Sequence, residues 1–154
     1  MTFSIAARCA DTGMFGIAVS SSSPAVAARC AHARAGIGAF GTQNITDPRL
    51  GPRGLDLMSG GATAEQAIAL LIRTSPYIEF RQLIAVDAQG GTAFHSGDRT
   101  LGTHGTAQAH GVVAAGNLLR NAEIPSIMVA AFQRAPGDSA VVKWFDGTAK
   151  KAAE

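Results

Sequence analysis

The sequence predicts an α+β fold in which strands and helices form separate layers. Strand-like alternation occurs in two hairpins, near residues 2–20 and 81–97. Amphipathic helical patterns follow, over about 64–74 and from Ile124 onward. The order is hairpin, strands, helices, hairpin, strand, helix, and it lacks the regular alternation of a parallel βαβ chain.

The size of the chain is that of one domain. It has 154 residues and a mass of 15.7 kDa, so residues 1–154 are expected to fold as a single unit. Hydrophobic residues make up 47% and charged residues 16%, which leaves little polar material to cover a monomer and favours self-association. Many of the 18 glycines fall in or beside strand-like segments, which indicates close-packed strands and tight turns.

Charge and hydropathy argue against several classes of protein. The net charge is +2, and only Lys150 and Lys151 are adjacent among the basic residues, so no nucleic-acid partner is expected. No apolar run approaches the ~18 residues of a membrane helix. Arg8 and Asp11 interrupt any signal-peptide pattern, so we expect a cytoplasmic protein without a membrane partner. In that reducing compartment the two cysteines are expected to be free thiols.

The first quarter of the chain is rich in strands. Residues 2–9 and 14–20 flank a turn at Asp11–Gly13 and are expected to form the N-terminal hairpin. A run of serines ends the second strand, and residues 25–34 have no clear pattern. Residues 36–43 read as a buried, glycine-rich strand.

The centre of the chain contains the clearest helix. Helical signals begin after Pro52, and Thr63 and Gln66 fit a capping box, in which each side chain bonds the backbone of the other. The apolar spacing then supports a helix over about 64–74, ended by Ser75–Pro76.

Strands return after this helix. Residues 81–87 and 92–97 are expected to form the second hairpin, followed by a loop over about 97–107 and a strand over 110–116. A second helix is expected to bury these residues at helical spacing: Ile124, Ile127, Met128, Ala131 and Phe132. Ser139–Phe145 is a candidate last strand, and the Lys/Ala-rich tail is expected to fray.

Two motif-like features are interpreted as structural. Gly36–Gly41 matches G-x-G-x-x-G, but the polar segment 42–48 does not open a helix that could hold a pyrophosphate, so a glycine-rich strand is favoured. Cys30 and His32 lack paired zinc-ligand spacing, and the other histidines are His95, His104 and His110. No metal or cofactor is expected, and a metal-dependent hydrolase is the least favoured enzyme class.

Thr2 is the candidate nucleophile. If Met1 is removed, Thr2 carries a hydroxyl and a free α-amine whose unperturbed pKa is about 7.7–8.0. Such an amine can act as the base that activates the hydroxyl. The alternative is that Thr2 has no catalytic role and is present only because a small second residue suits translation and N-terminal processing. If Met1 is retained, the nitrogen of Thr2 is an amide without basicity, and the chain is inactive or unprocessed.

Polar side chains that interrupt apolar strands are the other candidates. Gln43 and Asn44 end a buried strand, and Asn117 interrupts another. A buried amide either ties down a neighbouring loop or donates to a developing oxyanion. The serine run near Pro24 is either a turn or a polar lining for substrate, and its candidate residues are Ser20, Ser21 and Ser22.

An ordered set of segments resembles one bacterial family. The segments are MTFSIAAR, AVSSSSPAV, ARAGIGAFGTQN, GPRGLDLMSGG and GNLL. Together they are similar to domain of unknown function 1028 (DUF1028), which is placed in the N-terminal-nucleophile (Ntn) hydrolase superfamily. The resemblance covers about residues 1–135, and residues 136–154 are a divergent tail.

The resemblance implies an αββα four-layer sandwich of the Ntn-hydrolase type, shortened at the C-terminus. It also implies an amidohydrolase that cleaves an amide bond of a small molecule. Thr2 would attack, with its α-amine as base, and Ser20 to Ser22 would line the site together with Asn44. Gln43 or Asn117 would donate to the oxyanion or orient the substrate. The alternative is a catalytically silent scaffold of the same fold that binds a small ligand or assembles into oligomers.

Family members usually continue with another helix and further strands. The shorter chain would expose a sheet edge, and exposed edges pair readily with another chain. We therefore expect a homo-oligomer.

Overall fold

The computed structural model describes residues 1–134, which form two antiparallel four-stranded sheets and four helices. The predicted α+β class is confirmed. Sheet A has the strand order β2 (Phe15–Ser21), β1 (Thr2–Arg8), β8 (Val112–Asn117), β7 (Gly105–Ala109). Sheet B has the order β3 (Ala31–Arg34), β4 (Gly38–Asn44), β5 (Arg81–Asp87), β6 (Thr92–Ser96).

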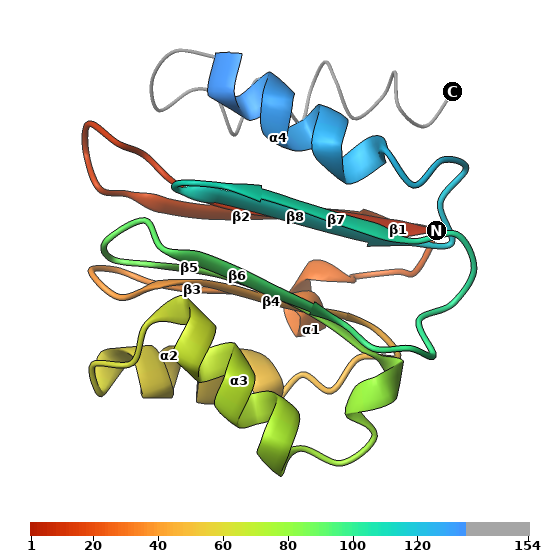
Figure 1. The fold of residues 1–154 in the computed structure, drawn as a ribbon, viewed down its shortest axis with the longest axis horizontal. Coiled ribbons are helices and arrows are strands. Elements are labelled where there is room, and N and C mark those ends of the chain that lie inside the picture. The colour runs from red at the N-terminus through yellow and green to blue at the C-terminus, as the bar shows by residue number, and fades with distance from the viewer. Residues whose placement is uncertain (135–154) are drawn as a thin grey trace.

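The sheets face each other, and helices cover their outer faces (Figure 1). Helix α4 (Ile124–Arg134) lies on sheet A, whereas α2 (Leu50–Ser59) and α3 (Ala64–Thr74) lie on sheet B. The short α1 (Ala27–Cys30) and a 3-10 turn (Ile78–Phe80) lie in connections. None of the described helices is long and apolar enough to cross a membrane.

Three apolar clusters hold these layers together. On β1, Phe3 and Ile5 point outward into the cluster under α4, while Ala6 points inward to the second sheet. This alternation follows from the two-residue period of a strand. The inward cluster also contains Ile84 and Val113, so both faces of each central strand are buried.

Small residues let α2 approach sheet B closely. A Cβ atom on Gly54 would overlap the ring of Phe40, which is fully buried on β4. A Cβ atom on Gly51 would likewise overlap the imidazole of His32. Glycine is therefore required here by space rather than by backbone conformation.

Most predicted elements are confirmed to within about two residues. The N-terminal hairpin, the hairpin of β5 and β6, and the capping box of α3 all form. The G-x-G-x-x-G segment runs into strand β4, as expected.

Two details of the sequence analysis were wrong. The expected loop over 97–107 contains the start of β7, because pairing with β8 gives the small residues of Gly105–Ala109 a strand conformation that they do not favour by themselves. In α4, Ile127 is 47% exposed, and Val129 lies instead on the buried face. The predicted strand Ser139–Phe145 and the tail lie outside the described residues.

Candidate functional site

The space between the sheets changes from apolar to polar at the start of β1. Over most of its length it is filled by residues such as Ala39, Val86 and Val113. At the end where β1 begins, the side chains on this face are Thr2, Ser21, Gln43, Gln82 and Asn117. Polar groups are unfavourable between sheets unless they are hydrogen-bonded, so this end is a candidate site.

Thr2 lies between two strands of sheet A at this polar end. It pairs with Ser21 of β2 on one side and with Asn117 of β8 on the other. Its hydroxyl Oγ1 is 2.8 Å from Oγ of Ser21, and either oxygen can be the donor. The pairing of β1 with β2 and β8 thus fixes the backbone of Thr2, and the hydrogen bond with Ser21 fixes the position of its hydroxyl.

A pocket of about 160 Å³ opens at this place. It is lined by Thr2, Ser21, Ser23, Val26, Arg29, Cys30, Gln43, Asn44 and Thr46. Four predicted site residues, Thr2, Ser21, Gln43 and Asn44, therefore share one pocket, although they come from three strands.

The remaining predicted residues do not line this pocket. Ser20 pairs with Phe3, whose side chain points toward α4, so Ser20 belongs to the opposite face of sheet A. Ser22 is exposed, and its N–H donates to the carbonyl of Met1 at 3.3 Å. Asn117 is 2% exposed and contacts the site through the buried amide cluster described next.

Gln82 is the centre of that cluster. Its Oε1 accepts an N–H from Gln43 and another from Asn117, each at 3.0 Å. Its Nε2 donates to Ser96 Oγ at 2.8 Å and to the carbonyl of Gly116 at 3.1 Å. Gln82 is fully buried and links β4 and β6 of sheet B to β8 of sheet A. Both predicted oxyanion donors thus already donate one N–H within the protein.

Two buried side-chain oxygens on the strands β4 and β1 lack a partner. Gln43 Oε1 and Ser4 Oγ have no hydrogen bond among the described residues. A buried acceptor without a partner costs about 1–3 kcal/mol, so natural folds retain few of them. Of the two residues, Gln43 lines the pocket, so its Oε1 is an acceptor for a polar group bound there.

Asn44 shapes the rim of the pocket. Its backbone has a φ of 75°, in the left-handed region that few residues other than glycine adopt. Its side chain donates to the carbonyl of Phe80 and accepts an N–H from Leu101 at 3.3 Å. Asn44 therefore ties down neighbouring loops, which was one of its two expected roles.

Several residues of the pocket were not predicted from the sequence. Arg29 and Cys30 come from the segment without a clear pattern, where the structure forms α1. Cys30 Sγ lies 3.5 Å from Thr46 Oγ1, and both described cysteines are free, as predicted. Gln82 was also missed, although a glutamine inside an apolar strand gives the same signal as Asn117.

Asp47 organises the loop behind Thr46. Its carboxylate accepts from Nε and Nη2 of Arg49 at 2.9 and 2.8 Å, and from the backbone N–H of Arg49 at 3.1 Å. The side-chain hydrogen bonds of Arg49 lower the pKa of Asp47 from 3.8 to about 2. The same hydrogen bonds, which Arg49 donates to Asp47, raise the pKa of Arg49.

We expect the free energy of unfolding of the Asp47→Asn variant to decrease less than that of the wild type when the pH is lowered into the acid range. The folded-state pKa of Asp47 lies below its unfolded value, so its stabilising effect is complete above 3.8 and is lost as pH falls towards 2. Arg49 is 79% exposed, so the loss near neutral pH should be below about 1 kcal/mol. Urea unfolding from neutral to acid pH measures this. Parallel curves for wild type and variant would contradict the expectation.

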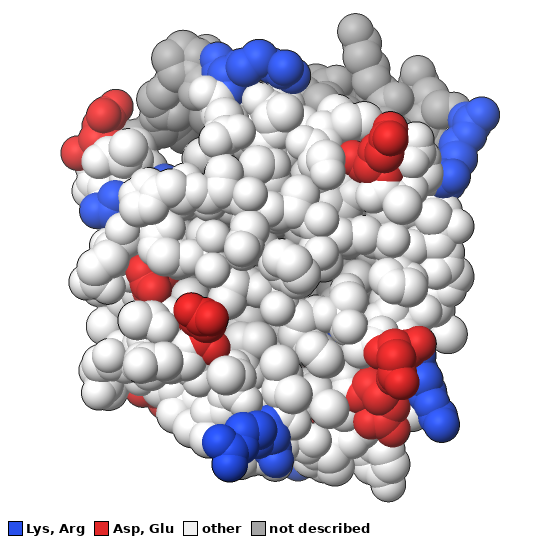
Figure 2. Space-filling view, in the orientation of Figure 1, with Lys and Arg blue, Asp and Glu red and all other residues white. Residues whose placement is uncertain are grey.

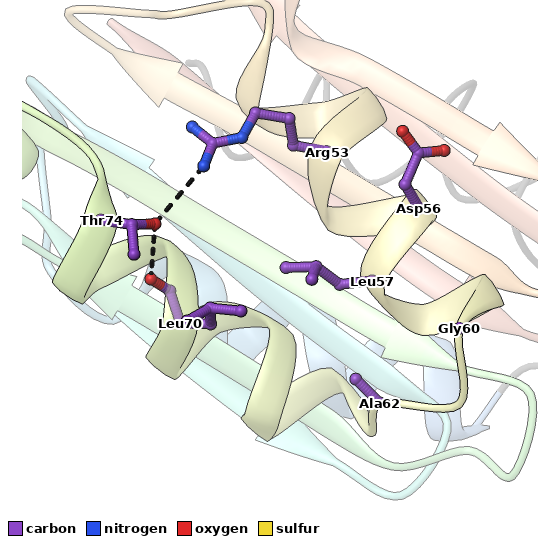
Figure 3. Close-up of a pocket in the computed structure, with 7 residues that line it drawn as sticks. All are labelled: Arg53, Asp56, Leu57, Gly60, Ala62, Leu70 and Thr74. Carbon is purple, nitrogen blue, oxygen red and sulfur yellow. Dashed lines mark hydrogen bonds between the residues drawn. The ribbon is translucent and has the colours of Figure 1, made fainter.

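A larger groove lies elsewhere, between α2 and α3 on the outer side of the molecule (Figure 3). Its volume is about 560 Å³, and Arg53 donates to Thr74 Oγ1 across it at 3.4 Å. Asp56, on its wall, pairs with Arg34. It contains none of the predicted site residues, and the smaller pocket remains the candidate because Thr2, the predicted nucleophile, lines it.

Charges are sparse on the face shown in Figure 2, where acidic and basic side chains are interspersed around uncharged surface. No group of His, Cys, Asp and Glu within the described residues is arranged to hold a metal ion. The expectations about nucleic acid and metal remain predictions.

The fold and the pocket define an α+β protein with two facing antiparallel sheets and a polar site at the start of its first strand. The chain belongs to the Family of unknown function (DUF1028), which matches residues 2–143. The crystal structure of protein SPO2555 from Silicibacter pomeroyi, also assigned to DUF1028, is similar with a TM-score of 0.85 and 24% identity. The match covers 92% of this chain and 68% of that one, and it supports the fold. A search of curated proteins found no match.

Proposed function

We propose that this protein is an Ntn-type amidohydrolase that cleaves an amide bond of a small molecule. The main support is the position of Thr2: its hydroxyl lies in a polar pocket, 2.8 Å from the Ser21 hydroxyl. In this proposal the layers of Figure 1 correspond to the αββα sandwich of the Ntn-hydrolase superfamily.

The proposed reaction begins with removal of Met1, which converts the Thr2 amide nitrogen into an amine. The amine takes the hydroxyl proton while Thr2 Oγ1 bonds to the substrate carbonyl carbon. The C–N bond then breaks, and the proton passes to the leaving amine. Water next attacks the resulting ester, releases the carboxylic acid and restores Thr2.

The other polar residues support this step. Ser21 orients the Thr2 hydroxyl, and Gln43 is the lining residue best placed to donate to the oxyanion through its second N–H. Asn117 acts through Gln82 as a positioning residue, because its amide donates there and is not part of the pocket wall.

Covalent labelling tests the proposal. Intact mass spectrometry should first show loss of Met1. A β-lactone should then acylate Thr2, opening its ring and adding the full mass of the lactone to the N-terminal peptide. Processed protein that gives no adduct, or an adduct mapped elsewhere, would contradict the proposed nucleophile.

A silent scaffold is the second candidate. It is favoured by the hydrogen bonds of Gln43 and Asn117 to Gln82, since these engage both predicted oxyanion donors. The sheet edges β2, β3, β6 and β7 would then offer pairing surfaces for a second copy. Light scattering that shows a dimer, together with a lack of lactone labelling in processed protein, would support this candidate.

A further inference from the structure

Arg29 places a positively charged side chain in the wall of the pocket that contains Thr2. Among the described residues that line the pocket, Arg29 is the one with a charged side chain; the others have hydroxyl, amide, thiol and apolar side chains. The ion pairs of the described region join Arg34 to Asp56 and Arg49 to Asp47. Arg29 therefore has no carboxylate partner within this part of the chain.

The guanidinium is held in place by neutral groups. Its Nη1 donates to the carbonyl of Pro24 at 3.1 Å, and its Nη2 donates to Ser23 Oγ. These bonds fix the side chain and leave the Nε N–H and one N–H on each terminal nitrogen for another acceptor. A planar guanidinium in a fixed position is well suited to bind a carboxylate through two hydrogen bonds.

The size of the pocket limits the ligand. Its volume of about 160 Å³ is below the ~300–1,000 Å³ of pockets for drug-sized molecules. A ligand that contacts both Arg29 and Thr2 in this pocket must therefore be a small molecule.

We infer that the substrate is a small amide or ureido compound that carries a carboxylate, and that Arg29 binds this carboxylate. This inference rests on the proposed function for the role of Thr2. Arg29 determines specificity because a carboxylate accepts two charge-assisted hydrogen bonds from its guanidinium, which a neutral amide of the same size cannot reproduce.

Binding of a matched pair of probes tests the inference. N-acetylglycine carries an amide and a carboxylate, whereas N-acetylglycinamide has nearly the same shape and no charge. Their affinities are measured by NMR titration of the Thr2→Ala protein, which cannot turn over either probe. We expect N-acetylglycine to bind at least about tenfold more tightly, a difference of about 1.4 kcal/mol, because its carboxylate can accept charge-assisted hydrogen bonds from the guanidinium.

Variants of Arg29 assign the preference to this residue. Arg29→Gln should remove it, and Arg29→Lys, which keeps the charge but loses the planar fork, should retain part of it. Arg53→Gln is the matched control, since Arg53 lies in the separate groove of Figure 3 and should not affect the preference.

Equal binding of the two probes, absence of binding by both, or a preference that survives in folded Arg29→Gln protein would overturn the inference. Arg29→Lys provides the second test if Arg29→Gln fails to fold: a preference as strong as that of the parent protein would overturn the assignment to the Arg29 guanidinium, because the α-amine of residue 2 can also bind a carboxylate. A negative lactone result with a positive probe preference would reject the catalytic role of Thr2 and keep the anion site.

Discussion

Thr2→Ala is expected to abolish amide hydrolysis and lactone labelling, with a loss of at least about 10³-fold in rate. The variant keeps a small residue after Met1, so removal of Met1 and the free α-amine should be unaffected. The substitution removes the hydroxyl, with its 2.8 Å hydrogen bond to Ser21, and also the methyl group of the threonine side chain. The measurement is the rate of adduct formation, followed by intact mass, with complete Met1 removal verified in the same spectra.

Thr2→Ser is the matched control for this prediction. Serine keeps the hydroxyl, the amine and the small size, and it loses only the β-methyl group, so labelling should persist. If Thr2→Ala reacts as fast as the wild type while still folded, the nucleophile is another residue. Cys30 is then the first residue to examine, because its thiol lines the same pocket.

Local patterns were sufficient to predict most elements of the fold. The turn at Asp11–Gly13 and the capping box of Thr63 and Gln66 depend on residues close in sequence, and both are present. The pairing of β1 with β8 joins residues more than a hundred positions apart, and no local pattern specifies its register. Strand β7 was missed for the same reason, since it is stabilised by its partner.

The candidate site could be predicted in part. Thr2, Ser21, Gln43 and Asn44 are noticeable in the sequence because they are polar residues at the ends of apolar strands, and the structure brings them to one pocket. Arg29 and Cys30 could not be placed in this way. They lie in a short helix without periodicity, and only the packing of α1 against β2 and β4 brings them to Thr2.

The other large effect is expected for Gln82→Leu, which should destabilise the protein by about 3–5 kcal/mol. Gln82 is fully buried, and its amide accepts from Gln43 and Asn117 while donating to Ser96 and to the carbonyl of Gly116. Leucine has a similar volume, but it removes the acceptor of two N–H groups and the donor to both the Ser96 hydroxyl and the Gly116 carbonyl. Each buried, unsatisfied group costs about 1–3 kcal/mol, partly offset by the apolar side chain.

Gln108→Leu is the control for this substitution, because Gln108 lies on strand β7 with an exposed side chain. It should change the free energy of unfolding by less than about 0.5 kcal/mol. Urea unfolding of both variants measures the difference. Gln82 bonds both Gln43, which lines the pocket with Thr2, and Asn117, which pairs with Thr2 in the sheet. The β-lactone should therefore acylate folded Gln82→Leu protein more slowly than the wild type. A Gln82→Leu protein as stable and reactive as the Gln108→Leu control would show that the amide cluster neither links the sheets nor positions the site.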